Sequence, residues 1–453
     1  MIMSNGYPKM ISFQSITAIA GSLVGTASMA TTTVNAVNSY AFTITTSDLI
    51  TSAGQIKITF PSALTFANQS SSCAVITNMT NMVSIPTCTF SSIDNSITFS
   101  NLNSSTSNIP SQTMTITVNN IQNPPSTATT PNFIVSTYYT SSLSTMVDTG
   151  PISGVTATVA TIDYTKVVIS SSSLITSDTA VTYYFSFVVA NPISVGGYIV
   201  LSYPLNIVFG LSTVSSNCQI MINSGTPLST PCSGSSSSSS YIFNYSNPLP
   251  STAATVGTNI TLIIANSATN PPSTQQVGPF SLQTYSSDGT IIANLLNSLS
   301  YQVTTPNSFT FNQFSRLSNQ NAAITTYTIT LTQIATLQPS DLLFVTFPSS
   351  LVPYSNSSCS ITYMNITSVV TCGLTNYTFK IVSLSSSIIG GNIFSITFTN
   401  IKNPLSYSPL TGFLVASRTA TNAYAYSSST STNSLSDSVP SLFKSVTYLY
   451  SPQ

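Results

Sequence analysis

The sequence predicts an all-β protein made of three similar antiparallel β-sandwich domains in tandem. First, the same landmarks recur three times in one order along the 453 residues. Second, Ile, Val, Thr, Tyr and Phe are abundant, and these residues suit the pleated, half-buried surface of a sheet. Third, Glu is absent and Lys and Arg are scarce, while the plentiful Ser, Thr and Asn compete for backbone hydrogen bonds and so disfavour helices.

Four landmarks define each repeat. An aromatic-proline pair ends a strand-like run, two cysteines follow, then an Asn-Pro turn, then a strand with an aromatic residue near its start. The Asn-Pro pairs are Asn123-Pro124, Asn270-Pro271 and Asn403-Pro404. The first-landmark prolines, Pro61, Pro204 and Pro348, are 143 and 144 residues apart. Solenoid units span roughly 20 to 50 residues, so this period indicates whole domains, which we expect at residues 1–158, 159–304 and 305–453.

Alternating apolar and polar residues predict short strands with one buried face. In the third repeat they predict strands at Tyr327–Leu331, Leu343–Phe347, Tyr377–Ile381, Phe394–Phe398 and Phe413–Ala416. Pro348 ends its strand because proline lacks a ladder donor, and Asn403-Pro404 turns the chain. About seven to nine strands per repeat match a two-sheet sandwich.

The N-terminal stretch from Met10 to Val24 weakly mimics a signal peptide, because Lys9 precedes it and small residues follow it. Polar residues interrupt it, however, and it takes the place of the first strand of the later repeats, Val167–Ile169 and Phe309–Phe311. We therefore expect it to be a strand. No run approaches the 18 apolar residues or so of a membrane-spanning helix, so no membrane span is expected.

Charge is scarce and scattered, with eight basic and eight acidic residues and a net charge of zero. No basic stripe is present, which argues against nucleic acid as a partner. No polybasic segment would attract an anionic membrane. So neutral a surface gives little protection against association, so we expect covalent glycans, or an assembled state, to keep the protein soluble.

Residues for catalysis are few. The chain has no His, which removes the usual general base and a common metal ligand. Its eight aspartates are never closer than 15 residues and form no Asp-x-Asp calcium pattern. Ser441 and Lys444 have a Ser-x-x-Lys spacing, which we interpret as chance in a Ser-rich chain. We expect no enzyme, no metal and no cofactor.

Six cysteines occur two per repeat, at separations of 15, 14 and 13 residues. Either they are pairs of free buried thiols or each repeat holds one disulfide. We favour disulfides, each clipping a local excursion onto a sheet: Cys73–Cys88, Cys218–Cys232 and Cys359–Cys372. Two thiols without His cannot fill a four-coordinate zinc site. Such disulfides indicate an oxidising compartment, so the expected location is extracellular or at the cell surface.

Eight Asn-x-Ser/Thr patterns predict N-glycosylation. They lie at Asn68, Asn78, Asn103, Asn244, Asn259, Asn356, Asn365 and Asn376. Because they flank the cysteine loops, Asn68, Asn78, Asn356 and Asn365 are the best candidates. The serine run from Ser235 to Ser240 is either a plain loop tip or an O-glycan acceptor. Glycans would supply the solubility that charges do not.

The tandem pattern of landmarks in a Ser/Thr/Asn/Ile-rich chain resembles the immunoglobulin-like repeats of large secreted or surface proteins of ciliates and similar protists. The resemblance covers almost the whole chain and implies immunoglobulin-like β-sandwiches with an extracellular structural role. We expect a glycoprotein that assembles head to tail into a filament, coat or stalk, with its own copies as partners. Met1–Ala30 and Val446–Tyr450 are the segments expected to exchange between subunits. The alternative is a cell-surface adhesin or lectin-like protein that binds through loops at the sandwich ends.

Overall fold

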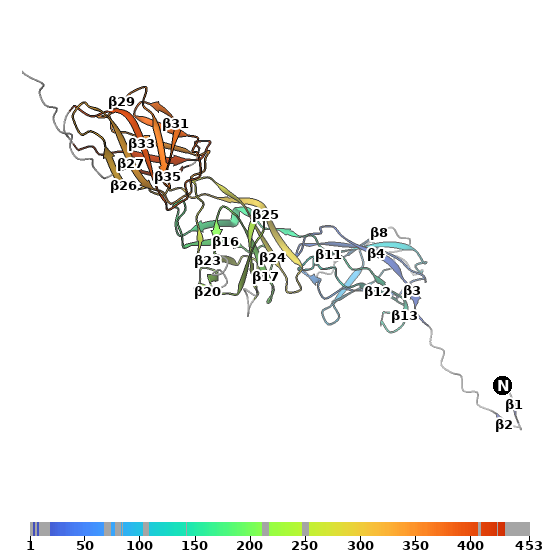
Figure 1. Cartoon of the computed structure of the whole chain (residues 1–453). Helices are drawn as coiled ribbons and strands as arrows, with labels where there is room; N and C mark the ends of the chain where they lie inside the picture. Colours follow the sequence, from blue (N-terminus) through green and yellow to red (C-terminus); the bar gives the residue numbers. More distant parts are fainter. Residues whose placement is uncertain are drawn as a thin grey trace, which may run out of the picture. The chain divides into compact units, whose positions relative to one another are not determined.

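The computed structural model describes residues 3–4, 7–8, 19–67, 74–77, 83, 85–102, 108–141, 143–210, 217–246, 253–405, 409–423 and 425–430. β-Strands make up nearly all the named elements, so the all-β prediction is confirmed (Figure 1). The chain forms two compact units. Unit 1 spans Met1–Thr161, Asn191–Ile193 and Thr284–Asn294, and unit 2 spans Ile162–Ala190, Ser194–Gln283 and Leu295–Gln453. The division into three domains stays a prediction, and "repeat" below refers to the three sequence ranges.

The first repeat contains two large sheets, besides a two-stranded pairing near its N-terminus. Its strands are β3 (Gly21–Ser22), β4 (Val24–Met29), β5 (Val37–Thr45), β6 (Gln55–Thr59), β7 (Thr65–Phe66), β8 (Ala74–Thr77), β9 (Thr87–Ser91), β10 (Ser96–Ser100), β11 (Thr113–Gln122), β12 (Phe133–Tyr138) and β13 (Met146–Ile152). One sheet has the order β3-β13-β12-β6-β10-β9, and the other has the order β4-β5-β11-β7, with β8 also on β11. β1 (Met3–Ser4) and β2 (Tyr7–Pro8) pair only with each other.

The second repeat has the same plan. Its elements are β14 (Ala160–Thr161), the 3-10 turn η1 (Tyr164–Lys166), β15 (Val167–Ser171), β16 (Val181–Val188), β17 (Tyr198–Pro204), β18 (Val208–Phe209), β19 (Cys218–Ile222), β20 (Leu228–Ser229), β21 (Cys232–Ser236), β22 (Ser240–Tyr245), β23 (Asn259–Thr269), β24 (Val277–Tyr285) and β25 (Ile291–Tyr301). One sheet has the order β14-β25-β24-β17-β22-β21 and the other β15-β16-β23-β19-β20, with β18 on β23.

The third repeat joins its strands into one ten-stranded sheet. They are β26 (Thr310–Arg316), β27 (Ile324–Thr332), β28 (Leu342–Thr346), β29 (Val352–Pro353), β30 (Cys359–Tyr363), β31 (Ile366–Thr375), β32 (Thr378–Val382), β33 (Ile393–Lys402), β34 (Leu414–Arg418) and β35 (Ala425–Thr430). The order is β26-β27-β33-β30-β31-β32-β28-β34-β35, with β29 on β33. The five strands predicted in this repeat are all present.

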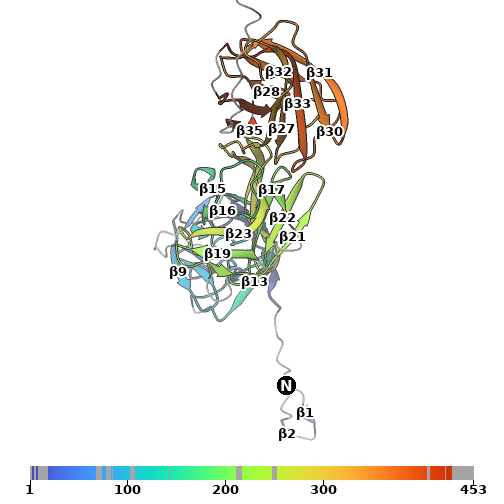
Figure 2. The same ribbon diagram turned by 60° about the vertical axis from the view of Figure 1, so that its left-hand side comes forward.

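The third repeat differs because β31 runs unbroken and pairs with β30 through its first half and with β32 through its second. In the other repeats a proline stands just before the corresponding strand, at Pro86 before β9 and at Pro231 before β21. Proline cannot donate to a sheet ladder and interrupts a strand. The third repeat has Thr371 ahead of Cys372 instead, so the strand crosses from one half of the sandwich to the other (Figure 2).

In the first repeat, the short β3 lies within the predicted range, but the strand that corresponds to β15 and β26 lies later than predicted. β4 pairs with β5 as β15 pairs with β16 and β26 with β27. It begins at Val24, where the predicted strand from Met10 to Val24 ends. Residues 10–18 lie outside the described residues.

The aromatic landmarks of the sequence meet in the core. The aromatic residue of each aromatic-proline pair packs edge to face against the aromatic residue that opens the last landmark strand. Phe60 lies 5.6 Å from Phe133, Tyr203 5.3 Å from Phe280, and Phe347 5.4 Å from Phe413, measured between ring centroids. All six are buried. Such contacts add about 0.5–1.5 kcal/mol each beyond area burial, so these two landmarks form one packing unit in each repeat.

Candidate functional site

The asparagine of each Asn-Pro turn is buried and makes at least three side-chain hydrogen bonds. In the third repeat, Asn403 is buried and its Oδ1 accepts a hydrogen bond from the Tyr327 hydroxyl at 2.5 Å. Its Nδ2 donates to the backbone oxygens of Ser318 at 2.9 Å and Gln320 at 2.7 Å. The equivalent bonds join Tyr40 to Asn123 and Tyr183 to Asn270, with the amides donating to Thr31 and Thr33 and to Ser173 and Ile175. We call this arrangement the Tyr–Asn lock. It ties the turn to the loop after the first strand.

A β-bulge places each lock. The strand before the Asn-Pro turn shifts register against its neighbour in all three repeats. An asparagine with a positive φ lies near each shift: Asn120 at 60°, Asn266 at 48° and Asn400 at 57°. Asn tolerates this left-handed conformation better than most residues. The extra residue of the bulge turns the following side chains, which lets the next asparagine reach the buried tyrosine.

Burial raises the pKa of the lock tyrosines. For Tyr40, Tyr183 and Tyr327, desolvation of the phenolate is the main cause of the raised pKa. The neutral hydroxyl is also the form that donates to the asparagine oxygen. The lock is therefore built for the protonated tyrosine, which makes it a structural element and not an acid–base pair near neutral pH.

The cysteines of the second and third repeats form disulfides, Cys218–Cys232 and Cys359–Cys372, with Cα atoms 6.0 and 6.1 Å apart. In the first predicted pair, Cys73 lies outside the described residues, and Cys88 is not a free thiol.

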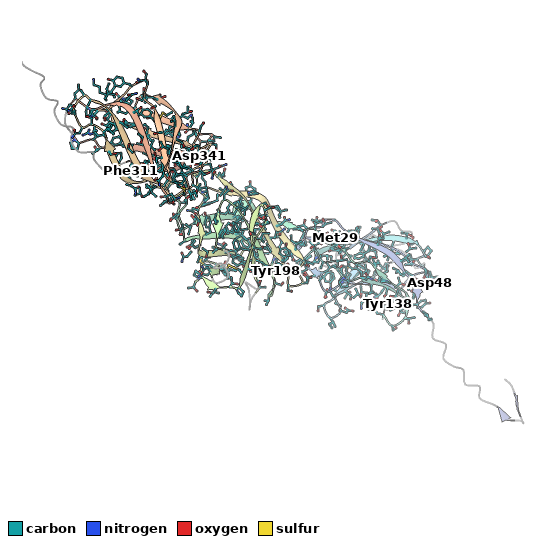
Figure 3. The ribbon with its side chains drawn as sticks, in the orientation of Figure 1. Met29, Asp48, Tyr138, Tyr198, Phe311 and Asp341 are labelled. Atoms are coloured by element: carbon teal, nitrogen blue, oxygen red, sulfur yellow. A yellow bond between two sulfur atoms is a disulfide. The ribbon has the colours of Figure 1, made fainter. Side chains whose placement is uncertain are left out.

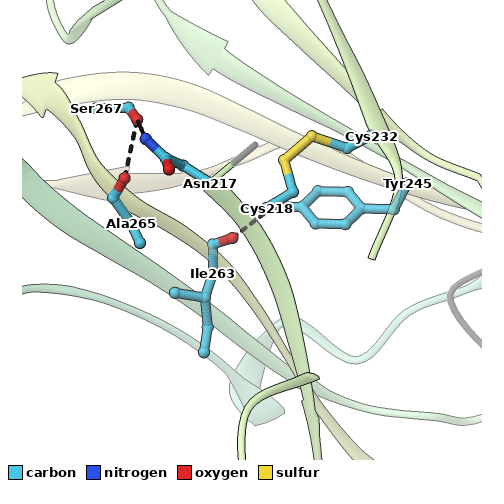
Figure 4. The surroundings of a disulfide bond; sticks show 7 residues. All are labelled: Asn217, Cys218, Cys232, Tyr245, Ile263, Ala265 and Ser267. Carbon is cyan, nitrogen blue, oxygen red and sulfur yellow. Dashed lines mark hydrogen bonds between the residues drawn. A yellow bond between two sulfur atoms is a disulfide. The ribbon is translucent and has the colours of Figure 1, made fainter. Parts of the chain in front are cut away.

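The disulfide of the second repeat differs from the prediction, because it does not clip a local excursion onto its own sheet. In the third repeat, Cys359 in β30 and Cys372 in β31 lie on neighbouring strands of one sheet. Cys218 begins β19 in one sheet and Cys232 begins β21 in the other, so the bond joins the two sheets. The ring of Tyr245 lies beside this bond, and its hydroxyl donates to the backbone oxygen of Ile263 at 3.3 Å (Figure 4). The physical reason is that the chain crosses between the sheets within the short cysteine loop.

The predicted glycosylation sites fall into three groups. Asn68, Asn78 and Asn103 lie outside the described residues. Asn244 and Asn259 lie in β22 and β23 and are partly buried, and the Oδ1 of Asn244 is enclosed without a hydrogen-bond partner in the part of the chain described. Exposed turns of the third repeat carry the others, which are Asn356, Asn365 and Asn376. The last two have a positive φ, at 63° and 54°, and sit at the two ends of β31.

Two carboxylates that are far apart in sequence come together in the first repeat. The Ser47 hydroxyl donates to Asp148 and also to Asp48 at 3.4 Å (Figure 3 labels Asp48). Asp148 is buried and accepts a bond from Thr137 at 3.3 Å. Within the described ranges no group of three or more His, Cys, Asp or Glu side chains could hold a metal ion. Ser441 and Lys444 lie outside those ranges.

The third repeat also has a pocket of about 260 Å³ that the sequence did not indicate. It lies between the β30–β31 hairpin and residues 384–389. Its wall combines apolar side chains with hydroxyls and includes no charged residue. The Tyr363 hydroxyl accepts hydrogen bonds from Ile389 N at 3.2 Å and Asn392 Nδ2 at 2.9 Å. A neutral ligand therefore suits it better than an ion.

Paired hydroxyls link neighbouring strands in every repeat. Examples are Thr45 with Thr113 at 2.7 Å, Ser186 with Thr261 at 2.8 Å and Thr330 with Ser395 at 2.9 Å. Each pair alternates along its strands with buried apolar residues. Such cross-strand pairs stabilise a sheet without adding charge to it.

No helix in the described ranges has the length and apolar character needed to cross a membrane.

No family model and no curated protein matches the chain. Solved structures that resemble it include the N-terminal domain of the Streptococcus gordonii adhesin Sgo0707 (10% identity, 91% of this chain and 89% of that one, TM-score 0.21). The C-terminal domain of the Streptococcus pyogenes antigen I/II-family protein AspA also matches (10% identity, 57% and 94%, TM-score 0.21). TM-scores this low establish no shared architecture. Nothing in these matches supports the resemblance to ciliate repeats.

Proposed function

We propose that this chain is an extracellular structural protein of a cell surface, built from repeated disulfide-clipped β-sandwich modules, and that it is not an enzyme. The observation that carries the proposal is the threefold Tyr–Asn lock. In each repeat the buried tyrosine and asparagine bond to each other and to the backbone of their own repeat, so these polar groups serve the fold. Intramolecular disulfides of this kind persist in oxidising compartments, which supports the extracellular location.

In its finer form, the proposal is that copies assemble head to tail into a filament, coat or stalk. β4, β15 and β26 each end the strand order of their sheet. β4 and β15 contain no Lys or Arg, the residues that commonly guard such edges. A strand from another copy can complete an unguarded edge, and a head-to-tail contact that does not close propagates.

Electron microscopy of the purified full chain tests this form. Uniform filaments are expected, and deletion of residues 441–453 should shorten or abolish them while hydrogen exchange inside each repeat stays unchanged. Particles that remain single at high protein concentration would rule out self-assembly. The adhesin or lectin-like protein would then be the remaining surface role.

The alternative is a cell-surface adhesin or lectin-like protein, and the pocket of the third repeat favours it. Screening the full chain against an array of neutral glycans would test this reading. Binding that is lost in a Ser386→Trp variant, which fills the pocket, would support it. Binding that this variant leaves intact would point to another surface.

A further inference from the structure

The β30–β31 hairpin places an acceptor asparagine at the rim of the pocket. Met364 and Asn365 form its two-residue turn, both with positive φ, as a type I′ hairpin requires. Tyr363 and Ile366 pair across the strands directly below the turn. Tyr363, Met364 and Ile366 all line the pocket, so Asn365 is flanked by pocket residues on both sides.

The rim of this pocket is unusually apolar for an exposed surface. Met364 is 63% exposed, Ile366 69% and Ile389 53%. Leaving such side chains in water forgoes roughly 25 cal/mol for each Å² of apolar area that could be covered. A contiguous exposed patch of this kind usually marks a place that something covers.

We propose that the first sugar of an N-linked glycan on Asn365 covers this pocket and stabilises the third repeat. The inference rests on the proposed extracellular function, because only a secreted chain is glycosylated in this way.

The chemistry of an N-acetylhexosamine fits the site. The sugar is neutral, and no charged side chain lines the pocket, so no unpaired charge is buried. Its C–H face and acetamide methyl group match Tyr363, Met364 and Ile366. Its hydroxyls can bond Ser386 and can accept a hydrogen bond from the Tyr363 O–H, whose oxygen already accepts from Ile389 and Asn392. The volume of about 260 Å³ is below the roughly 300–1,000 Å³ of sites for drug-sized ligands, which favours one ring.

The covalent tether makes even a weak contact effective. A sugar attached at Asn365 is held beside its site at an effective concentration of the order of millimolar or more. The attached sugar therefore loses much less translational entropy on binding than a free sugar would. Even a small and open pocket can therefore hold the attached sugar.

Asn376 provides a matched control. It lies in the hairpin turn at the opposite end of β31, is exposed, has a φ of 54° and precedes Tyr377 and Thr378 in a complete acceptor pattern. None of these three residues lines the pocket. A glycan there should be attached as readily and should gain no such contact.

The test uses the full chain secreted from a eukaryotic host, with Asn365→Gln and Asn376→Gln variants. One sample keeps its whole glycans and another is trimmed enzymatically to the single first sugar. Hydrogen exchange of residues 361–366 and 384–389 is followed by mass spectrometry. We expect exchange to be roughly two- to tenfold faster in Asn365→Gln, the range of one aromatic stacking contact. Trimming to one sugar and the Asn376→Gln change should have no effect on these peptides.

A second variant separates the loss of the glycan from a direct effect of the Asn365→Gln substitution on the hairpin turn. Ile366→Thr keeps the acceptor pattern and removes part of the pocket wall, so the protection due to the glycan should shrink in it. Equal exchange with and without the Asn365 glycan would overturn the proposal, as would an unmodified Asn365 in a chain whose Asn376 is glycosylated. Protection that instead rises with protein concentration would assign the pocket to a second copy of the chain. If no acceptor were modified, the glycoprotein part of the proposed function would fall as well.

Discussion

Replacing Asn403 with alanine should lower the free energy of unfolding of the third repeat by more than the few side-chain atoms removed would suggest. The change removes one hydrogen bond from Tyr327 and two bonds to the backbone oxygens of Ser318 and Gln320. Each buried bond contributes about 0.5–1.5 kcal/mol net, and partners left unsatisfied add to the loss. We therefore expect the third repeat to lose about 3 kcal/mol of unfolding free energy.

Hydrogen exchange resolved by peptide is the suitable assay, because a chain of several repeats need not unfold in one step. A loss of about 3 kcal/mol corresponds to exchange roughly a hundredfold faster in the third repeat, with the first repeat unchanged. Tyr327→Phe removes the hydroxyl's bonds to Asn403 and Arg316 but keeps the two bonds from Asn403 to the backbone, and should cost about 1–2 kcal/mol. Asn312→Ala, at an exposed position, should change stability by less than about 0.5 kcal/mol. An Asn403→Ala effect as small as that of Asn312→Ala would refute the Tyr–Asn lock.

Three further outcomes can be measured. Replacing Cys359 and Cys372 together with serine should destabilise the third repeat by about 3 kcal/mol, as expected for a closed loop of this length, seen as a lower denaturation midpoint. Gly150→Ala should destabilise the first repeat, because the new Cβ would collide with the backbone oxygen of Leu23; a thermal midpoint equal to that of the wild type would contradict the close approach. Tyr183 and the other lock tyrosines have a folded pKa above their unfolded value of about 10, so their contribution is complete below pH 10 and is lost as pH rises above it. Absorbance titration should then show these tyrosines ionising together with unfolding, and not at pH 10 in the folded protein.

The sequence alone determined the repeat and the character of the fold. The landmarks and the alternating residues between them are local signals. They predicted the strands around Phe347, Phe398 and Phe413, because successive side chains of a strand point to opposite faces and apolar residues therefore recur at every second position. The pairing of cysteines within a repeat was also accessible, since the two cysteines of a repeat are close along the chain.

Only the tertiary structure decided how these landmarks are used. That Phe347 meets Phe413, and that Asn403 bonds Tyr327, depends on contacts between segments more than sixty residues apart in sequence, which no local pattern encodes. The same holds for the cysteine bond that joins two sheets and for the placement of Asn365 beside a pocket. Strand pairing and register bring such distant residues together, and both depend on how the whole repeat packs. Composition sets only which residues are present to be packed.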